Sequence, residues 1–368
     1  MINRFPLLPI LFSMVFLAAC KQENVKPETE VDLYFPEAAS EWETLDPTAL
    51  NWDAAKLEEL YTYLAANGTR AFIILKDGKI VIEKYWGQAL IGGGDFTRES
   101  NWYWASAGKS LTATLVGIAQ QEGLLSVADR TSDHLGIGWT SASMEKENII
   151  TIKDQLSMTT GLDYEVANID CTLPECLNYK EDAGQQWYYH NAPYTLLEEV
   201  VSAAAGTNYN SFTTNQLSNK IGMQGLWVKG EFNNVYYSNA RSAARFGLFI
   251  LAEGRWAEVQ ILTDNAYYQE MVNSSQALNP AYGYLWWLNG KEQFLLPGST
   301  FKFNGQLASN APSDLFAAMG KNGQFINVIP SEKMVVVRMG EAPDNALVPI
   351  LFHDEMWRLI QAAKGNAE

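Results

Sequence analysis

Hydrophobic and polar positions first show a helical period in residues 54–67. Apolar side chains recur there every three or four positions, which places them on one side of a helix. Asn51 or Asp53 can cap the start of this helix, and Gly68 follows its end. We therefore predict a helix that packs one face against the body of the protein.

The period then changes to two, and the same change recurs near the other end of the chain. Segments 71–76 and 79–86 flank Asp-Gly, a dipeptide that favours a tight hairpin turn. Segments 324–329 and 334–339 form a similar pair, and a helical pattern over 346–363 follows them. Two hairpins and two terminal helices predict one shared antiparallel sheet flanked by these helices.

The middle of the chain is mainly helical in pattern. We divide the body into 46–105, the first part of an α/β domain, 106–275, an inserted mainly helical subdomain, and 276–368, the second part of the α/β domain. The predicted fold class is therefore α+β. A small-molecule site is expected where the sheet meets the helical part, because clefts form at such junctions.

The N-terminal region has the features of an export signal. Residues 1–19 combine one positive charge with a short apolar run, which predicts a secretory signal peptide. Residues 17–20, Leu-Ala-Ala-Cys, resemble a bacterial lipobox, which implies a lipidated Cys20 and a membrane anchor. Lys21 resembles the sorting pattern of the outer membrane more than the inner one. Residues 20–45 are acidic and interrupted by proline, so we interpret them as a tether.

Charge and cysteine content narrow the possible partners. The net charge of −16 argues against nucleic acid and against electrostatic binding to an anionic membrane surface. Apart from Cys20, the chain has only Cys171 and Cys176, five positions apart. In an oxidising compartment we interpret this pair as a disulfide rather than a metal site, because further ligands are scarce.

A serine and a lysine three positions apart provide the candidate chemistry. Ser106 lies at the start of a predicted helix, where free backbone N–H groups favour a developing negative charge. Lys109 then lies on the same helical face, beside the hydroxyl. The same spacing occurs at 143–146, in a charged loop-like segment, and at 299–302, in a turn entering a strand. Only Ser106 begins an amphipathic helix, although a capping serine with a solvated lysine is the ordinary alternative.

Two rival motifs fail at this segment. A phosphate-binding loop needs glycine at position 103, where Tyr103 stands. A nucleophile elbow needs glycine at position 104, where Trp104 stands. Neighbouring aromatic side chains could line an acyl pocket, but we interpret them as core packing residues. They are Trp102, Tyr103, Trp104, Trp187 and Tyr188.

The base that activates Ser106 has two candidates. His190 is the most interesting of three histidines, since His134 and His353 fit structural positions. The other route couples Lys109 to a tyrosine, because a desolvated lysine beside a phenol can accept a proton near neutral pH. Tyr189 with Asn191 supplies that tyrosine on a loop before a helix, and Tyr237 is the competing position.

Several segments, in order along the chain, resemble the serine β-lactamase-related family of class C type. That family includes class C β-lactamases, DD-peptidases, family VIII esterases and 6-aminohexanoate-dimer hydrolases. The resemblance covers roughly residues 50–362, and it implies the β-lactamase/transpeptidase-like fold. The matching segments are 106–110, 155–163, 189–197, 243–247, 282–287 and 323–324.

The resemblance also implies roles for individual residues. Ser106 would be the nucleophile, Lys109 and Tyr189 the base system, and Asn191 a residue that orients the substrate, with reach to Lys109. The backbone N–H groups of Ser106 and Lys321 would form the oxyanion hole.

One position departs from the family pattern. The strand that faces the serine normally carries a cationic residue, but the aligned stretch 316–321 has Ala318 there. A cation would help to bind the carboxylate of a β-lactam, so its absence favours the esterase and 6-aminohexanoate-hydrolase branches.

We therefore predict a lipid-anchored serine hydrolase that acts on a small-molecule ester or amide in the periplasm or at the cell surface, without cofactor or metal. A β-lactamase or DD-peptidase is one alternative. A non-catalytic peptidoglycan-binding lipoprotein is the other, and Ala318 is its best support.

Overall fold

The computed structural model describes residues 1, 33–38 and 40–365, and residues 33–368 group into one compact unit. The predicted signal peptide (1–19) and Cys20 lie outside the described residues apart from Met1. Among the described residues, no helix combines the length and apolar character needed to cross a membrane.

A six-stranded antiparallel sheet forms the centre of this unit. Its order is β2-β1-β13-β12-β11-β8, so strands from both ends of the chain pair side by side. Both predicted hairpins, β1–β2 and β12–β13, are confirmed. The strands are β1 (Thr69–Lys76), β2 (Lys79–Tyr85), β8 (Trp287–Leu288), β11 (Phe316–Gly320), β12 (Gln324–Ile329) and β13 (Met334–Gly340).

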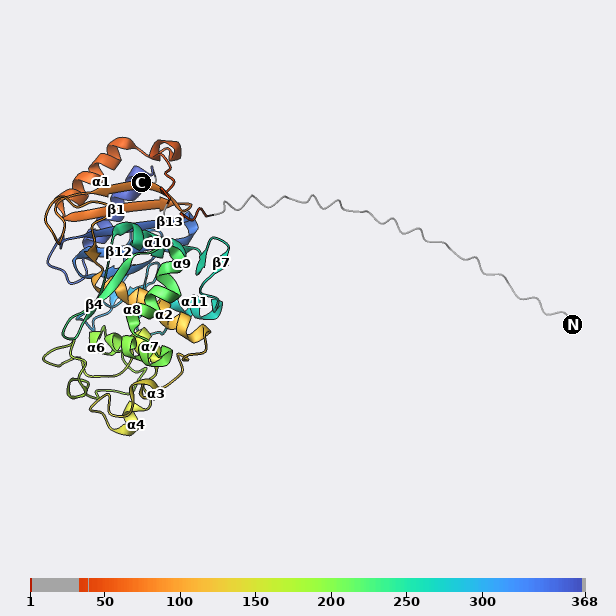
Figure 1. The fold of residues 1–368 in the computed structure, drawn as a ribbon, viewed down its shortest axis with the longest axis vertical. Helices are drawn as coiled ribbons and strands as arrows, with labels where there is room; N and C mark the ends of the chain where they lie inside the picture. Colours follow the sequence, from red (N-terminus) through yellow and green to blue (C-terminus); the bar gives the residue numbers. More distant parts are fainter. Residues whose placement is uncertain (2–32, 39, 366–368) are drawn as a thin grey trace. The chain divides into compact units, whose positions relative to one another are not determined.

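Helices cover both faces of this sheet, and the alternation of side chains along β12 shows how. Phe325 points to α12 (Ile350–Ala363), where its ring meets Phe352. The next residue, Ile326, points the other way, toward Gly247 of α10 (Ala240–Leu251). The N-terminal helix α1 (Ala54–Ala66) packs against α12 (Figure 1). The predicted α+β architecture with flanking terminal helices is therefore confirmed.

The helical part is organised around α2 (Gly108–Gln121), which is buried from residue 108 to residue 119. A short 3₁₀ turn, η2 (Ala105–Ala107), leads into it from β3 (Trp102–Tyr103). The small sheet β3-β5-β4 lies beside this turn. The remaining elements here are α3 (Thr131–Leu135), α4 (Met144–Glu147), α5 (Ile152–Ser157), α6 (Asn191–Thr195), α7 (Leu197–Ala205), α8 (Tyr209–Thr213), α9 (Asn219–Ile221), β4 (Gly225–Lys229), β5 (Asn234–Ser238), β6 (Arg255–Trp256), β7 (Val259–Gln260) and α11 (Asn265–Met271).

Beyond shifts of one or two residues, the structure differs from the sequence-based expectation in four places. The C-terminal helix begins at Ile350 rather than 346, directly after Pro349. Segment 143–146 contains a short helix, α4, rather than only a loop, and the strand expected near 299–302 is limited to β10 (Phe303–Asn304), paired with β9 (Gln293–Phe294).

The fourth difference concerns the predicted tether. Its residues 33–45 contact the body: Tyr34 N donates to Asp77 O and Leu45 N to Ile80 O. The compact unit therefore begins at Leu33.

Candidate active site

Ser106 lies in the turn that connects β3 to α2. The backbone before it is fixed by a hydrogen bond from Trp104 N to Tyr236 O at 2.8 Å. Ala105 has a φ of +46°, a left-handed conformation that is uncommon for a residue with a Cβ. Such backbone strain is often found at functional sites, where the surrounding structure holds it in place.

Lys109 lies one helical turn after Ser106, as the spacing predicts. Its Nζ donates to Ser106 Oγ at 3.4 Å, and its side chain is almost completely buried. The ammonium faces the ring of Tyr194, 3.9 Å from the centroid. Burial lowers the Lys109 pKa to about 7, opposed by the negative charge of Asp170. Near neutral pH a substantial fraction of this amine is therefore unprotonated and able to accept a proton.

Tyr189 reaches the same site from the loop before α6. Its ring stacks on Trp287, and Lys109 Nζ lies 5.1 Å from its centroid. Burial raises the Tyr189 pKa well above its ordinary value, and the hydroxyl of Ser106 offsets only part of that rise. The phenol is therefore protonated at neutral pH, which makes it a proton donor beside Ser106 rather than a free base.

Asn191 is the first residue of α6 and also borders the site. Its Nδ2 donates to Asp170 Oδ1 at 2.7 Å. The amide therefore contacts Asp170, whereas the sequence analysis expected Lys109 as its partner. Asp170 directly precedes Cys171, which forms a disulfide with Cys176.

The end of β11 closes the site from the sheet side. A Cβ added at Gly320 would lie 2.6 Å from Trp104 O and 3.0 Å from Ser106 N, so only glycine allows this approach. Lys321 follows directly and borders the cavity beside Ser106. Ala318 is completely buried on the same strand. Lys321, whose backbone N–H the sequence analysis assigned to the oxyanion hole, is therefore among the residues that line the cavity with Ser106.

A cavity of about 300 Å³ contains these groups. The predicted residues Ser106, Lys109, Tyr189, Asn191 and Lys321 all border it. Sequence reasoning missed the other lining residues, because no spacing rule connects their distant segments. They are Ala105, Asp170, Tyr194, Thr195, Asn233, Asn234, Val235, Pro297, Leu347 and Val348.

The competing bases do not reach Ser106. His190 is buried and does not line the cavity, its two ring nitrogens have no hydrogen-bond partner within the described part of the chain, and burial lowers its pKa to about 4. Tyr237 lies in β5 opposite Tyr103 and does not border the cavity. The Ser106–His190 pair considered from the sequence is therefore wrong.

Three of the five aromatic side chains near the site belong to the core, as the sequence analysis favoured, whereas Tyr103 packs half-buried against the core and Tyr188 stacks on Tyr164. Trp102, Trp104 and Trp187 are each at most 3% exposed. None of the five predicted aromatic positions borders the cavity.

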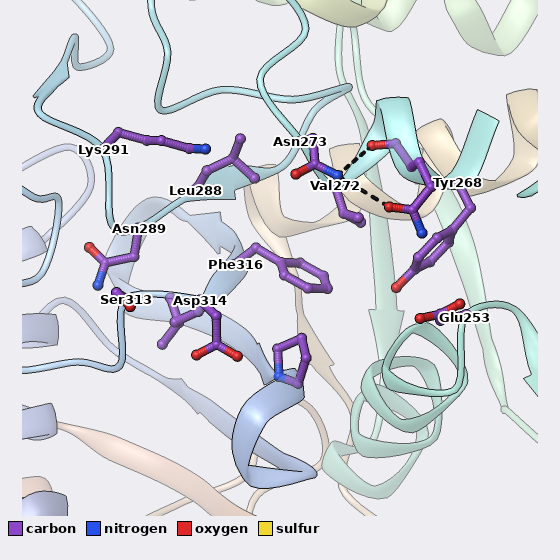
Figure 2. Close-up of a pocket in the computed structure, with 13 residues that line it drawn as sticks. Glu253, Tyr268, Val272, Asn273, Leu288, Asn289, Lys291, Ser313, Asp314 and Phe316 are labelled. Carbon is purple, nitrogen blue, oxygen red and sulfur yellow. Dashed lines mark hydrogen bonds between the residues drawn. The ribbon is translucent and has the colours of Figure 1, made fainter. Parts of the chain in front are cut away.

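A second cavity, of about 260 Å³, lies near edge strand β8 and shares no lining residue with the first (Figure 2). Leu288 and Phe316 line it, and Lys291 and Glu253 lie at opposite sides of the view. In the described part of the chain, no group of three or more histidine, cysteine or acidic residues could hold a metal ion.

A family model described as Beta-lactamase matches residues 63–346. The chain belongs to the β-lactamase family. This is a family of serine hydrolases and penicillin-binding proteins, and the match includes every candidate site residue named above except Leu347 and Val348. The resemblance inferred from the sequence motifs is therefore confirmed at the level of the family.

One relative of this β-lactamase-family protein matches it along most of the chain at low sequence identity. An uncharacterised protein of Alkalihalophilus pseudofirmus is 24% identical over 305 residues, which cover 74% of this chain and 83% of that protein.

Among solved structures, a Bacillus anthracis protein provisionally named 6-aminohexanoate-dimer hydrolase is 16% identical. It has a TM-score of 0.67, with 91% of this chain and 90% of that chain covered. A family VIII carboxylesterase is 15% identical with a TM-score of 0.61, and the match covers 82% of this chain and 97% of that chain.

Proposed function

We propose that this protein is a serine hydrolase that cleaves an ester or amide bond through an acyl-enzyme on Ser106. The observation that carries the proposal is a buried lysine, Lys109, with its Nζ 3.4 Å from Ser106 Oγ and its pKa lowered to about 7. A lysine that is partly neutral at physiological pH can remove the proton of a neighbouring hydroxyl.

The acylation step uses three side chains. Neutral Lys109 accepts the Ser106 proton while Oγ attacks the carbonyl carbon of the substrate, and the carbonyl oxygen becomes negatively charged. The N–H groups of Ser106 and Lys321 would stabilise this oxyanion. As the intermediate collapses, the Tyr189 hydroxyl donates its proton to the leaving oxygen or nitrogen, and the Lys109 ammonium returns a proton to Tyr189.

Deacylation reverses these roles. A water molecule gives a proton to the base system and attacks the acyl carbon, and Ser106 leaves with a proton. The products are a carboxylic acid and an alcohol or amine, and the reaction needs no group from outside this site.

The substrate preference within this class rests on Ala318. Because a buried methyl group replaces a cation on β11, a β-lactam carboxylate has no partner at that position. This supports ester or amide hydrolysis of the esterase or 6-aminohexanoate-hydrolase type. The placement on a membrane by a lipid at Cys20, facing the periplasm or cell surface, is part of the proposal and rests on the lipobox resemblance.

The test uses the purified protein without residues 1–20. A fluorophosphonate should add one adduct, mapped to Ser106 by mass spectrometry, and p-nitrophenyl butyrate should be hydrolysed. Ser106→Ala should lose both, whereas Ser110→Ala, on the same helix but hydrogen-bonded to Leu285 O, should keep both if it folds. Equal turnover by Ser106→Ala would exclude the mechanism. If the wild type showed neither labelling nor turnover, the result would favour the peptidoglycan-binding alternative.

A further inference from the structure

Asp170 is a carboxylate within the active-site cavity that the mechanism above does not use. It borders the cavity together with Ser106 and Lys109, and it accepts a hydrogen bond from Asn191 Nδ2 at 2.7 Å. A second contact joins the two segments, because Ala192 N donates to Ile169 O at 3.2 Å. The pair Asp170–Asn191 therefore connects the segment before the disulfide to the start of α6.

The chemistry of this pair fixes the orientation of the Asn191 amide. An ionised carboxylate only accepts hydrogen bonds, so the amide must present its NH₂ to Asp170 and its oxygen elsewhere. That oxygen, Oδ1, is buried and has no hydrogen-bond partner among the described residues. A buried acceptor without a donor is costly, so a donor that arises during the reaction would be stabilised there.

The reaction supplies such a donor in Lys109. When Ser106 gives up its proton, Lys109 becomes an ammonium ion although its side chain is only 4% exposed. The polar groups around it are the Ser106 hydroxyl, the two phenols of Tyr189 and Tyr194, and the ammonium of Lys321 at the cavity wall. The negative charge of Glu198 on α7 raises the pKa of Tyr194. The carboxylate whose charge raises the pKa of Lys109 is Asp170.

We propose that Asp170 is a positioning residue: it holds Asn191 with its oxygen free for a donor, and it provides the negative charge that stabilises the Lys109 ammonium. Asp170 acts through Asn191 and through its charge, and it takes no proton itself. This inference rests on the proposed function for its catalytic consequence, although its effect on Lys109 is measurable without turnover.

The disulfide explains how Asp170 is kept in place on an irregular segment. Cys171 forms the disulfide with Cys176, and its backbone N donates to Asn168 O at 3.1 Å. The Asp170 N donates to the Asn168 side chain at 3.0 Å. Covalent closure beside Asp170 limits the conformations that this segment can adopt.

The experiment compares Asp170→Asn with Asp170→Ala. Asparagine keeps an oxygen that can accept from Asn191 but removes the charge, whereas alanine removes both. The matched control is Asp163→Asn, which removes a carboxylate that pairs with Lys180 outside the cavity.

The first readout is the titration of Lys109, followed by NMR of ¹³Cε-labelled lysine and assigned by the signal lost in Lys109→Met. We expect Asp170→Asn to lower the Lys109 pKa further and Asp163→Asn to leave it unchanged. An unchanged Lys109 titration in Asp170→Asn would overturn the inference, whether or not the protein is an active hydrolase.

The second readout is the pH dependence of kcat/KM. The acid limb of the pH profile should move to lower pH in Asp170→Asn. In Asp170→Ala, where Asn191 is no longer oriented, kcat should be about tenfold lower than in Asp170→Asn. A rise in KM alone, with the acid limb unmoved, would mean that Asp170 only contacts substrate. Absence of wild-type turnover together with a shifted Lys109 titration would reject the proposed function and keep this inference.

Discussion

At the scale of single residues, the most informative feature is Lys109. This lysine is buried, and among the described residues no carboxylate forms a hydrogen bond with it. Most lysines keep their ammonium group in water, because transfer into a low-dielectric interior is costly. Lys109 is 4% exposed, and its pKa falls from 10.5 to about 7. The same burial that makes it a base near neutral pH must reduce the stability of the fold.

The first prediction concerns the pH dependence of hydrolysis. Lys109 accepts a proton only when it is neutral, so kcat/KM should fall on the acid side of its pKa of about 7, by about tenfold per pH unit. His190, with a pKa of about 4, would give an acid limb near pH 4 instead. Initial rates with p-nitrophenyl butyrate between pH 5 and 9, corrected for spontaneous hydrolysis, distinguish the two bases.

The second prediction is that Lys109→Met abolishes activity and stabilises the protein. The unfolded state binds the lysine proton up to pH 10.5, whereas the folded state releases it near pH 7, so the lysine weakens the fold most at and below pH 7. At about 1.4 kcal/mol per pKa unit, the gain at pH 7 is a few kcal/mol. Urea unfolding should show this gain shrinking as pH rises toward 10.5.

Lys56→Met is the control for that experiment, because Lys56 lies on the exposed face of α1 and its salt bridge to Glu59 is solvent-accessible. The difference in unfolding free energy between Lys56→Met and the wild type should be small and should change little between pH 7 and 10, because both proteins keep Lys109. A loss of stability in Lys109→Met at pH 7 would mean that the ammonium is well solvated in the folded protein.

At the scale of elements, the site depends on the contact between η2 and the end of β11. Gly320 lies so close to Trp104 and Ser106 that any side chain would separate the two segments. Ser106 and Lys321 belong to different elements, so their separation depends on this close approach of the backbone at Gly320.

The third prediction tests that contact through Gly320→Ala. Its Cβ would meet backbone atoms at 2.6–3.0 Å, which cannot move like a flexible side chain. We expect kcat/KM to fall by about 100-fold or more and the unfolding free energy to drop by about 1–3 kcal/mol. Gly230→Ala is the control, since its Cβ would meet only Asn233 O at 3.5 Å. Full activity in Gly320→Ala would show that the two segments adjust independently.

Sequence patterns predicted these elements well but predicted their contacts poorly. The hairpins, α1 and the Ser106–Lys109 geometry follow from local periodicity, which is a property of neighbouring residues. Asp170 and Tyr194 could not be identified, because the position of Asp170 depends on a disulfide-closed irregular segment and that of Tyr194 on the packing of α6 with α5 and α7. The start of α12 was misplaced because proline at 349, not hydrophobic period, decides it.

At the scale of the whole molecule, residues 33–45 belong to the folded unit. Arg245 is buried on α10 and donates to Pro36 O and Glu37 O at 2.9 Å each. Trp42 Nε1 donates to Gly78 O at 2.8 Å in the β1–β2 turn. This segment thus satisfies a buried guanidinium and covers a hairpin, although composition alone made it look like a linker.

The fourth prediction compares two truncations. A protein that starts at residue 33 is the reference. A protein that starts at residue 46 should lose several degrees in Tm, because it leaves Arg245 without two of its acceptors and exposes the hairpin. Differential scanning fluorimetry at one protein concentration measures both. Equal Tm values for the proteins that start at residues 33 and 46 would mean that residues 33–45 act only as a tether.

The central sheet has a consequence for the order in which the chain can fold. β1 pairs with β13, so Ile73 must find Val337 after the whole helical insertion has been synthesised. Pairing between such distant segments is slow, because the entropy cost of closing a long loop comes before any stabilising contact forms. A chain still emerging from the ribosome therefore cannot complete this sheet.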